Sequence, residues 1–218
     1  MRLGSTRDDE KGGLLVVLLH GWGARGDDLV SLAQELSRPR VRFVVPAAPL
    51  AEGPRGRAWW RRAGAERPGF AESDVLPKDF QPNPQVLASR HAVQAVLRDA
   101  QERYAPDALA VAGFSQGAML ALDVALAADP PVARAAALSG VLLADSVPAL
   151  QTRPQRPPAI FVSHGRTDAV LPFARGANIE KLLEPHGYPV TFFPFDGGHE
   201  IPRAVVAELR KFLFEQPG

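Results

Sequence analysis

The sequence predicts an α/β fold in which a mostly parallel sheet is covered by helices on both faces. Two observations support this prediction. Short apolar runs alternate with longer stretches of helical periodicity along nearly the whole chain, which is the pattern of strand–helix–strand units. The first of these runs, Leu14 to Leu19, is apolar without alternation, as expected for a strand that is buried on both faces of a parallel sheet.

The elements follow one another in a regular order. We expect strands where apolar runs end at glycine, proline or polar loops, at 14–19, 41–45, 109–113, 133–138, 159–162 and 189–195. We expect helices where apolar residues recur at helical spacing, at 29–36, 86–104, 118–128, 175–186 and 201–214. Asp27 or Asp28 is placed to cap the first helix, and Arg90 is expected on the solvated face of the second helix.

The region from Ala47 to Gln85 has a different character. It holds six prolines, little periodicity and four large aromatic residues, Trp59, Trp60, Phe70 and Phe80. A long irregular stretch in a compact domain is uncommon unless it is functional or disordered, and the aromatics argue against disorder. Two interpretations stay open: a surface excursion that packs its aromatics on the nearest helix, or a loop folded over the sheet edge where substrate binds.

Composition limits the possible functions. The chain has 218 residues, of which 46% are hydrophobic and 22% charged, which fits one medium domain spanning 1–218 with a sizeable core. Lys and Arg number 25 and Asp and Glu 24, a formal charge of +1, so bulk charge does not point to nucleic acid. No cysteine is present, which excludes a disulfide, a thiolate nucleophile and a cysteine metal site.

The N-terminal residues 1–13 are polar and charged and lack the apolar stretch of a secretory signal. The longest apolar run is far too short to span a bilayer. We therefore expect a cytoplasmic protein, monomeric or homodimeric, without stable membrane insertion, although prior removal of a signal peptide stays open.

The stretch 109–119 carries the clearest chemical signal. An apolar run ends at Gly113, Ser115 follows, Gly117 comes two residues later, and a helix-forming segment continues the chain. G-x-S-x-G between a strand and a helix is typical of the nucleophile elbow of the α/β-hydrolase fold. The serine is held on a strained turn, so strand and helix approach closely and glycine removes the side chains that would collide. The alternative is an ordinary Gly-Ser turn between core elements.

A serine needs a base within hydrogen-bond reach, and that base needs an orienting carboxylate. In this fold the chain order is Ser, then Asp or Glu, then His. His199 follows the last strand and a Gly-Gly turn, and Asp168 follows a strand between Ser115 and His199, so these two are the predicted base and acid. The less favoured candidates were His20, His91, His164 and His186 for the base and Asp123, Asp129, Asp145 and Asp196 for the acid.

The oxyanion of such a reaction needs two preset backbone N–H donors. We expect one from Gln116, directly after the nucleophile, and one from Trp22 in the glycine-rich loop after the first strand. The Trp22 indole would then wall the substrate pocket. The histidines show no metal-ligand spacing such as H-x-x-x-H, so no metal site is predicted.

The chain resembles the phospholipase/carboxylesterase family of α/β-hydrolases, which includes the acyl-protein thioesterases. The matching segments are 20–23, 26–29, 46–49, 58–60, 113–117, 164–165 with Asp168 and Pro172, and 197–199. The resemblance implies a hydrolase without a large cap domain, metal or other cofactor, with Trp59 and Trp60 in the loop that shapes the acyl pocket. Family members often have an aspartate after this aromatic pair, whereas this chain has Arg61-Arg62. The segment before Leu14 is short, and it stays open whether one or both antiparallel edge strands of the wider fold are missing.

The leading hypothesis is a serine carboxylesterase that cleaves small-molecule esters with small to medium acyl chains through an acyl-enzyme on Ser115. A thioesterase, a lysophospholipase or an amidase would use the same triad. A non-catalytic ligand-binding protein on the same fold is the alternative of a different class, because a fold alone does not fix a function.

Overall fold

The computed structural model describes residues 2–4, 11–62, 68–152 and 155–215. The strands are β1 (Arg2–Gly4), β2 (Leu14–Leu19), β3 (Val41–Val44), β4 (Leu50–Glu52), β5 (Gly56–Ala58), β6 (Ala108–Phe114), β7 (Arg134–Leu138), β8 (Ala159–Gly165) and β9 (Val190–Phe195). The helices are α1 (Val30–Glu35), α2 (Pro84–Tyr104), α3 (Gln116–Ala127), α4 (Val147–Leu150), α5 (Phe173–Leu183) and α6 (Arg203–Phe214), with 3₁₀ turns at Ala144–Ser146 and Glu184–His186.

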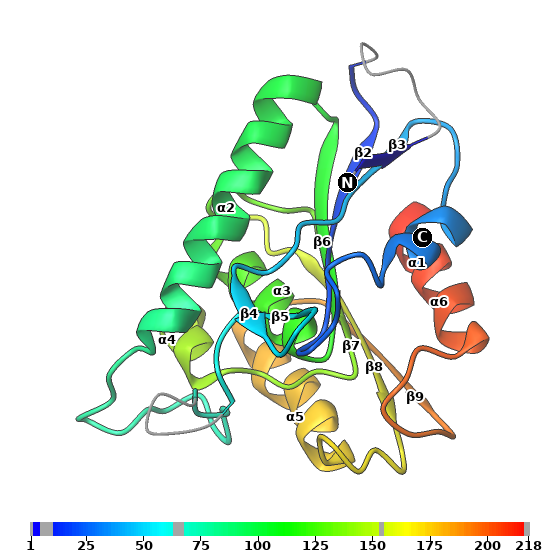
Figure 1. Cartoon of the computed structure of the whole chain (residues 1–218). Coiled ribbons are helices and arrows are strands. Elements are labelled where there is room, and N and C mark those ends of the chain that lie inside the picture. Colours follow the sequence, from blue (N-terminus) through cyan, green and yellow to red (C-terminus); the bar gives the residue numbers. More distant parts are fainter. Residues whose placement is uncertain (1, 5–10, 63–67, 153–154, 216–218) are drawn as a thin grey trace.

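A seven-stranded sheet forms the centre of the molecule, with the strand order β1-β3-β2-β6-β7-β8-β9 (Figure 1). The six strands from β3 to β9 in this order run parallel, and β1 pairs with β3 antiparallel. The predicted α/β-hydrolase fold with a mostly parallel sheet and no large cap is confirmed. Of the antiparallel edge strands that the sequence left open, the described residues contain one, β1.

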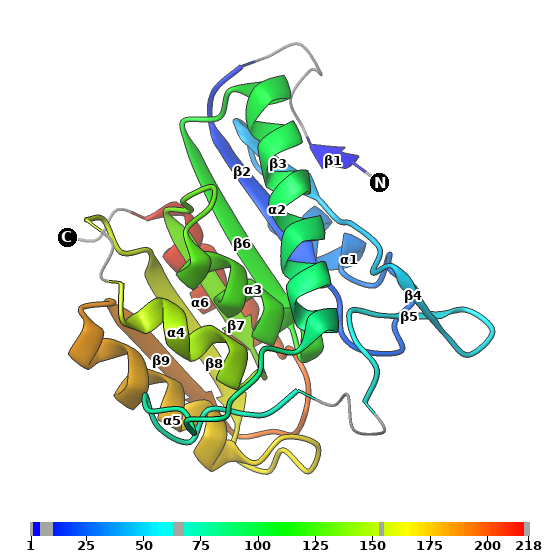
Figure 2. The same ribbon diagram turned by 90° about the vertical axis from the view of Figure 1, so that its left-hand side faces the viewer.

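Helices cover both faces of the sheet, as predicted (Figure 2). The central strand β2 explains how, because successive side chains of a strand point to opposite faces. Leu15, Val17 and Leu19 pack into the core that includes α2, α3 and α5. Val16 and Leu18 pack into a second core with α1 and α6. A strand with an apolar layer on each side needs no polar residue, which is why its sequence does not alternate.

The loop before α1 differs from the expectation. The helix begins after Leu29 with no side-chain cap, so neither Asp27 nor Asp28 caps it. The Asp28 carboxylate instead accepts a hydrogen bond from the backbone N–H of Arg25, 2.6 Å away. It closes the glycine-rich loop that carries Trp22 and is not available to the helix.

Arg90 was also placed wrongly, because it does not lie on a solvated face. It makes two hydrogen bonds of 2.7 Å to the buried carboxylate of Asp123 on α3. Helix α2 packs directly on α3 here, and a buried carboxylate requires a charged partner. The ion pair therefore ties the two helices together beneath the site described below.

The region 47–85 contains a short antiparallel hairpin, β4–β5, that periodicity did not predict. Its second strand docks on the Trp22 loop, because Gly23 N–H donates to the Arg57 carbonyl and Arg57 N–H donates to the Ala24 carbonyl. Further on, Ala71 N–H donates to the Leu142 carbonyl. We call residues 56–62 and 68–72 the facing wall, because they lie opposite the elbow that carries Ser115.

None of the helices in the described ranges combines the length and the apolar character that crossing a bilayer requires.

Candidate active site

Ser115 lies between β6 and α3 in a strained conformation. Its φ of 54° and ψ of −116° are rare for a residue with a side chain. The flanking glycines allow the surrounding packing, as the sequence predicted. A Cβ at Gly117 would overlap the Leu19 carbonyl, and a Cβ at Gly113 would overlap the Gly117 carbonyl. The serine is thus presented at the carboxyl end of the sheet, where parallel strands place their functional loops.

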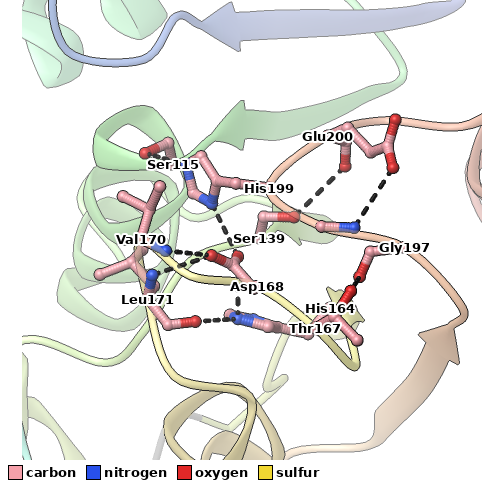
Figure 3. Close-up of polar contacts among 11 residues, drawn as sticks. Ser115, Ser139, His164, Thr167, Asp168, Val170, Leu171, Gly197, His199 and Glu200 are labelled. Carbon is pink, nitrogen blue, oxygen red and sulfur yellow. Dashed lines mark hydrogen bonds and ion pairs between the residues drawn. The ribbon is translucent and has the colours of Figure 1, made fainter.

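The structure brings Ser115, His199 and Asp168 together (Figure 3). His199 Nε2 lies 2.8 Å from Ser115 Oγ, and His199 Nδ1 lies 2.7 Å from Asp168 Oδ2. An ionised carboxylate can only accept, so the imidazole carries its hydrogen on Nδ1 and leaves Nε2 to accept from the serine hydroxyl. The His199 ring also packs against Phe114, with 4.9 Å between ring centroids.

The turn after β8 holds the Asp168 carboxylate. Its Oδ1 accepts hydrogen bonds from the backbone N–H groups of Val170 and Leu171 at 2.8 and 2.9 Å. Burial opposes the charge, but the bonds from Leu171, His199 and Val170 outweigh it and hold the pKa of Asp168 below its ordinary value. Asp168 therefore stays an anion that can stabilise a neighbouring imidazolium.

His164 has the structural role that its position suggested. It is fully buried, and its Nε2 lies 2.9 Å from the Leu171 carbonyl and 3.3 Å from Asp168 Oδ2. Its Nδ1 faces Gly176, where an added Cβ would overlap the ring. His164 thus supports the Asp168 turn from below and has no contact with Ser115.

Two hydroxyl groups fix the loop that carries His199. Thr167 Oγ1 donates to the Gly197 carbonyl at 2.9 Å, and Ser139 Oγ donates to the Glu200 carbonyl at 3.3 Å (Figure 3). The Glu200 carboxylate accepts from Gly198 N–H at 3.2 Å. The base is therefore positioned by residues at the ends of neighbouring strands.

The other candidate acids lie elsewhere. Asp123 pairs with Arg90, Asp129 with Arg98 and Asp196 with Arg166. Asp145 accepts from the backbone N–H of Asn83. None of them contacts His199, so the acid that chain order selected is also the one in reach.

The remaining histidines are occupied or distant. The buried His20 donates from Nδ1 to the Gly21 carbonyl at 2.8 Å, and its Nε2 accepts from Ala48 N–H at 3.0 Å. Burial lowers the pKa of His20, which keeps it neutral in this role. His186 lies 3.1 Å from Asp74, and His91 is exposed on α2.

The predicted oxyanion donors are in the loop after β2 and at the first residue of α3. Gln116 begins α3, so its N–H has no partner within the helix. Trp22 lies in the loop after β2, and a Cβ added at the adjacent Gly21 would lie 3.3 Å from the Phe114 ring and 3.4 Å from Ser115 Cβ. Among the described residues, the backbone N–H groups of Trp22 and Gln116 donate to no other group of the protein.

The Gln116 side chain has a second role that the sequence did not reveal. Its Oε1 accepts from Trp59 N–H at 2.9 Å, and its Nε2 donates to the Trp60 carbonyl at 2.8 Å. Ser89 Oγ completes the anchor by donating to the Trp59 carbonyl at 2.6 Å. The aromatic pair is thus fastened to the elbow itself.

A cavity of about 140 Å³ opens beside Ser115. Trp22 and Trp60 line it, as expected. Trp59 does not, so its predicted place in the substrate pocket is wrong. Trp59 follows the end of β5 and is almost completely buried, with 2% of its surface exposed. Trp59 therefore turns inward, where its indole N–H donates to the His20 carbonyl at 3.0 Å and its ring packs on His20.

Several residues of the cavity were missed. The other lining residues are Arg62, Pro68, Phe70, Met119, Val170, Leu171, Pro172 and Arg175, with Ser115 and Gln116 at the elbow. Two signals could have found some of them. Met119 follows Ser115 by one helical turn, and Val170 to Pro172 directly follow Asp168. Nothing in the sequence singles out Arg175.

Within the described ranges, no group of three or more His, Cys, Asp or Glu side chains is arranged to hold a metal ion.

Comparison with known proteins agrees with this geometry. Residues 6–215 match the family model described as Phospholipase/Carboxylesterase. The chain belongs to the phospholipase/carboxylesterase family. The match covers the elbow and both partner loops.

Individual relatives of this family member have names that refer either to a thioesterase or to a carboxylesterase. The chain is 25% identical over 218 residues to acyl-protein thioesterase 1 of Gibberella zeae, covering 92% of this chain and 89% of that protein. It is 27% identical over 204 residues to a probable carboxylesterase of Oryza sativa subsp. japonica, covering 91% and 76%. The crystal structure of esterase PE8 superposes with a TM-score of 0.75 at 28% identity, covering 99% of this chain and 97% of that one.

Proposed function

We propose that this family member is a serine carboxylesterase that acts on small-molecule esters with small to medium acyl chains. The observation that carries the proposal is the contact series Ser115 Oγ, His199 Nε2, His199 Nδ1 and Asp168 Oδ2, with spacings of 2.8 and 2.7 Å. These are hydrogen-bond distances for a serine, its base and the orienting acid. The cavity of about 140 Å³ supports a substrate of modest size.

The proposed reaction begins when Ser115 Oγ attacks the ester carbonyl carbon and His199 Nε2 takes the hydroxyl proton. Asp168 stabilises the resulting imidazolium. The oxyanion accepts hydrogen bonds from the N–H groups of Trp22 and Gln116. When the tetrahedral intermediate collapses, the alcohol leaves with the proton from His199 and the acyl group stays on Ser115.

Water then completes the cycle. It attacks the acyl carbonyl while His199 takes one of its protons, and collapse of the second intermediate releases the carboxylic acid and returns the proton to Ser115. The Gibberella zeae relative named acyl-protein thioesterase 1 favours a second candidate, a thioesterase. A thiol would leave through the same steps.

The test is a panel of esters, thioesters, amides and lysophospholipids of graded acyl length, combined with fluorophosphonate labelling. Ser115→Ala should lower turnover by about 10⁴- to 10⁶-fold, because removal of the nucleophile disables the whole triad. It should also abolish the covalent mass shift. Ser163→Ala is the matched control, since Ser163 is buried on the neighbouring β8 and its hydroxyl has no partner within the described structure.

Wild-type rates in Ser115→Ala, or the absence of labelling in folded wild-type protein, would refute the proposal and favour the ligand-binding alternative. Faster turnover of thioesters than of matched esters would shift the assignment to the second candidate.

A further inference from the structure

The cavity beside Ser115 carries an excess of positive charge. Among the described residues, its lining contains two arginines, Arg62 and Arg175, and no acidic side chain. The remaining surface is mostly aromatic and aliphatic. A purely apolar acyl chain would need no cation, so the two guanidinium groups call for an explanation.

The charge of Arg175 is already neutralised by an acidic partner. Its guanidinium lies 2.8 Å from the Glu72 carboxylate and 4.9 Å from the centre of the Phe70 ring. It sits in the first turn of α5, which carries no acidic residue. The N-terminal end of a helix disfavours positive charge, which makes an arginine here unusual and adds to the positive potential at the cavity.

Arg62 differs from Arg175, because it has no acidic partner among the described residues. Its guanidinium lies over the Trp22 indole, 4.9 Å from the ring centre, a cation–π contact that holds the side chain at the mouth of the cavity. Among the described residues, no carboxylate lies within ion-pair distance of it. Stacking occupies the face of a guanidinium and leaves its in-plane N–H donors available to bind an anion.

The position of Arg62 in the sequence places its charge next to the aromatic pair that shapes the cavity. It follows the aromatic pair whose second member, Trp60, walls the cavity, and Gln116 fastens that pair to the elbow. A positive charge on this short segment is therefore held near the reacting serine by the same contacts that shape the cavity.

We propose that the site selects esters that carry a negatively charged group, a carboxylate or a phosphate, away from the scissile bond, and that Arg62 is the residue that recognises it. This rests on the proposed esterase function. The anion keeps the same charge in the ground state and the transition state, so its recognition should lower KM more than it raises kcat.

The experiment uses matched neutral and anionic esters in two arms. In the first arm the charge is on the acyl side: 4-nitrophenyl half esters of adipic and suberic acid are compared with their methyl-capped forms. In the second arm it is on the alcohol side: butyryl esters of 4-hydroxybenzoate and of 4-hydroxyphenyl phosphate are compared with the butyryl ester of methyl 4-hydroxybenzoate. The measured quantity is the ratio of kcat/KM for the anionic and the neutral partner.

We expect this ratio to favour the anion by about five- to tenfold in at least one arm, the effect of one charge-assisted hydrogen bond at a partly exposed site. Arg62→Gln should abolish the preference, because the KM of the anionic ester should rise to that of its neutral partner measured in the same variant. Arg62→Lys should keep most of it. Arg61→Gln is the control, because it removes an equal charge from the adjacent exposed residue, which does not line the cavity.

No anion preference in either arm, or a preference that survives Arg62→Gln, would overturn the proposal. Failure of the esterase function itself is distinguishable, because the neutral esters would then also be inert or would be turned over equally by Ser115→Ala.

Discussion

The two sides of the cavity are held in place in different ways. On the catalytic side, Ser115, Asp168 and His199 follow β6, β8 and β9 of one parallel sheet, where backbone packs on backbone and a single Cβ at Gly117 would not fit. The facing wall lies outside this sheet: backbone hydrogen bonds join Arg57 to the Trp22 loop and Ala71 to Leu142, and the side chains of Gln116 and Ser89 hold its aromatic pair.

This difference separates reaction from selectivity. The sheet fixes the catalytic side, because moving one strand end would disturb the ladder hydrogen bonds of both neighbours. The wall can change its residues without changing the sheet, provided that its few anchors remain. Substitutions on the catalytic side should therefore affect turnover, and substitutions that loosen the wall should affect substrate binding and stability.

After Ser115→Ala, the largest effect is expected for Asp168→Asn, which tests the catalytic side. The Asn oxygen can still accept from Val170 and Leu171, so the turn should persist, but its N–H₂ group would face His199 Nδ1 and favour the wrong tautomer. Turnover of a neutral ester should fall by about 10⁴-fold, with a melting temperature close to that of the wild type.

Asp196→Asn is the control for this prediction, because its side chain is 95% exposed and pairs only with Arg166. It should keep wild-type turnover. If both variants lost turnover equally, the loss would come from removing negative charge near the site and not from a changed orientation of His199.

A smaller effect is expected for Gln116→Ala, which releases the wall but keeps the backbone N–H of residue 116. The buried Trp59 N–H and Trp60 carbonyl lose their partners, at about 1–3 kcal/mol for each group. The free energy of unfolding should fall by about 2–6 kcal/mol in denaturant titrations, and KM should rise more than kcat falls.

Gln85→Ala removes a similar bond, which Arg61 N–H donates to Gln85 Oε1 at an exposed position. It should lower the free energy of unfolding by less than about 1 kcal/mol. If kcat falls in Gln116→Ala while KM stays constant, the two sides of the cavity are not separable in the way described above.

The smallest effect concerns the pH dependence of stability. Burial lowers the pKa of His20 in the folded state, so below about pH 6.5 the unfolded chain takes up a proton at this residue that the folded chain does not. Its contribution to stability is complete above that pH and is lost as the pH falls, by up to about 1.4 kcal/mol per pH unit.

His20→Gln should therefore show a shallower loss of unfolding free energy between pH 7 and 5 than the wild type. The other histidines are the same in both proteins, so the difference between the two curves isolates His20. Parallel curves would show that His20 is protonated in the folded protein.

The structural features that depend on local sequence pattern could be predicted from the sequence. The elbow could be predicted because the glycines report a close approach of strand and helix, and the candidate acid and base followed from chain order. Other features depend on pairings between distant segments. Whether Trp59 or Trp60 faces the cavity depends on how residues 47–62 dock on the Trp22 loop, which local pattern does not determine. The burial of Arg90 likewise depends on the packing of α2 against Asp123 of α3.

Gln116 also matters for anyone who wishes to redesign this protein. A single codon specifies both a backbone donor beside the nucleophile and the side chain that fastens the aromatic pair of the wall. A library that diversifies the wall should hold residue 116 constant and vary Trp60, Arg62 and Phe70, because most replacements at 116 would release the wall whatever they did for selectivity. Over evolutionary time, the same coupling would allow the specificity of the cavity to drift while the elbow stays unchanged.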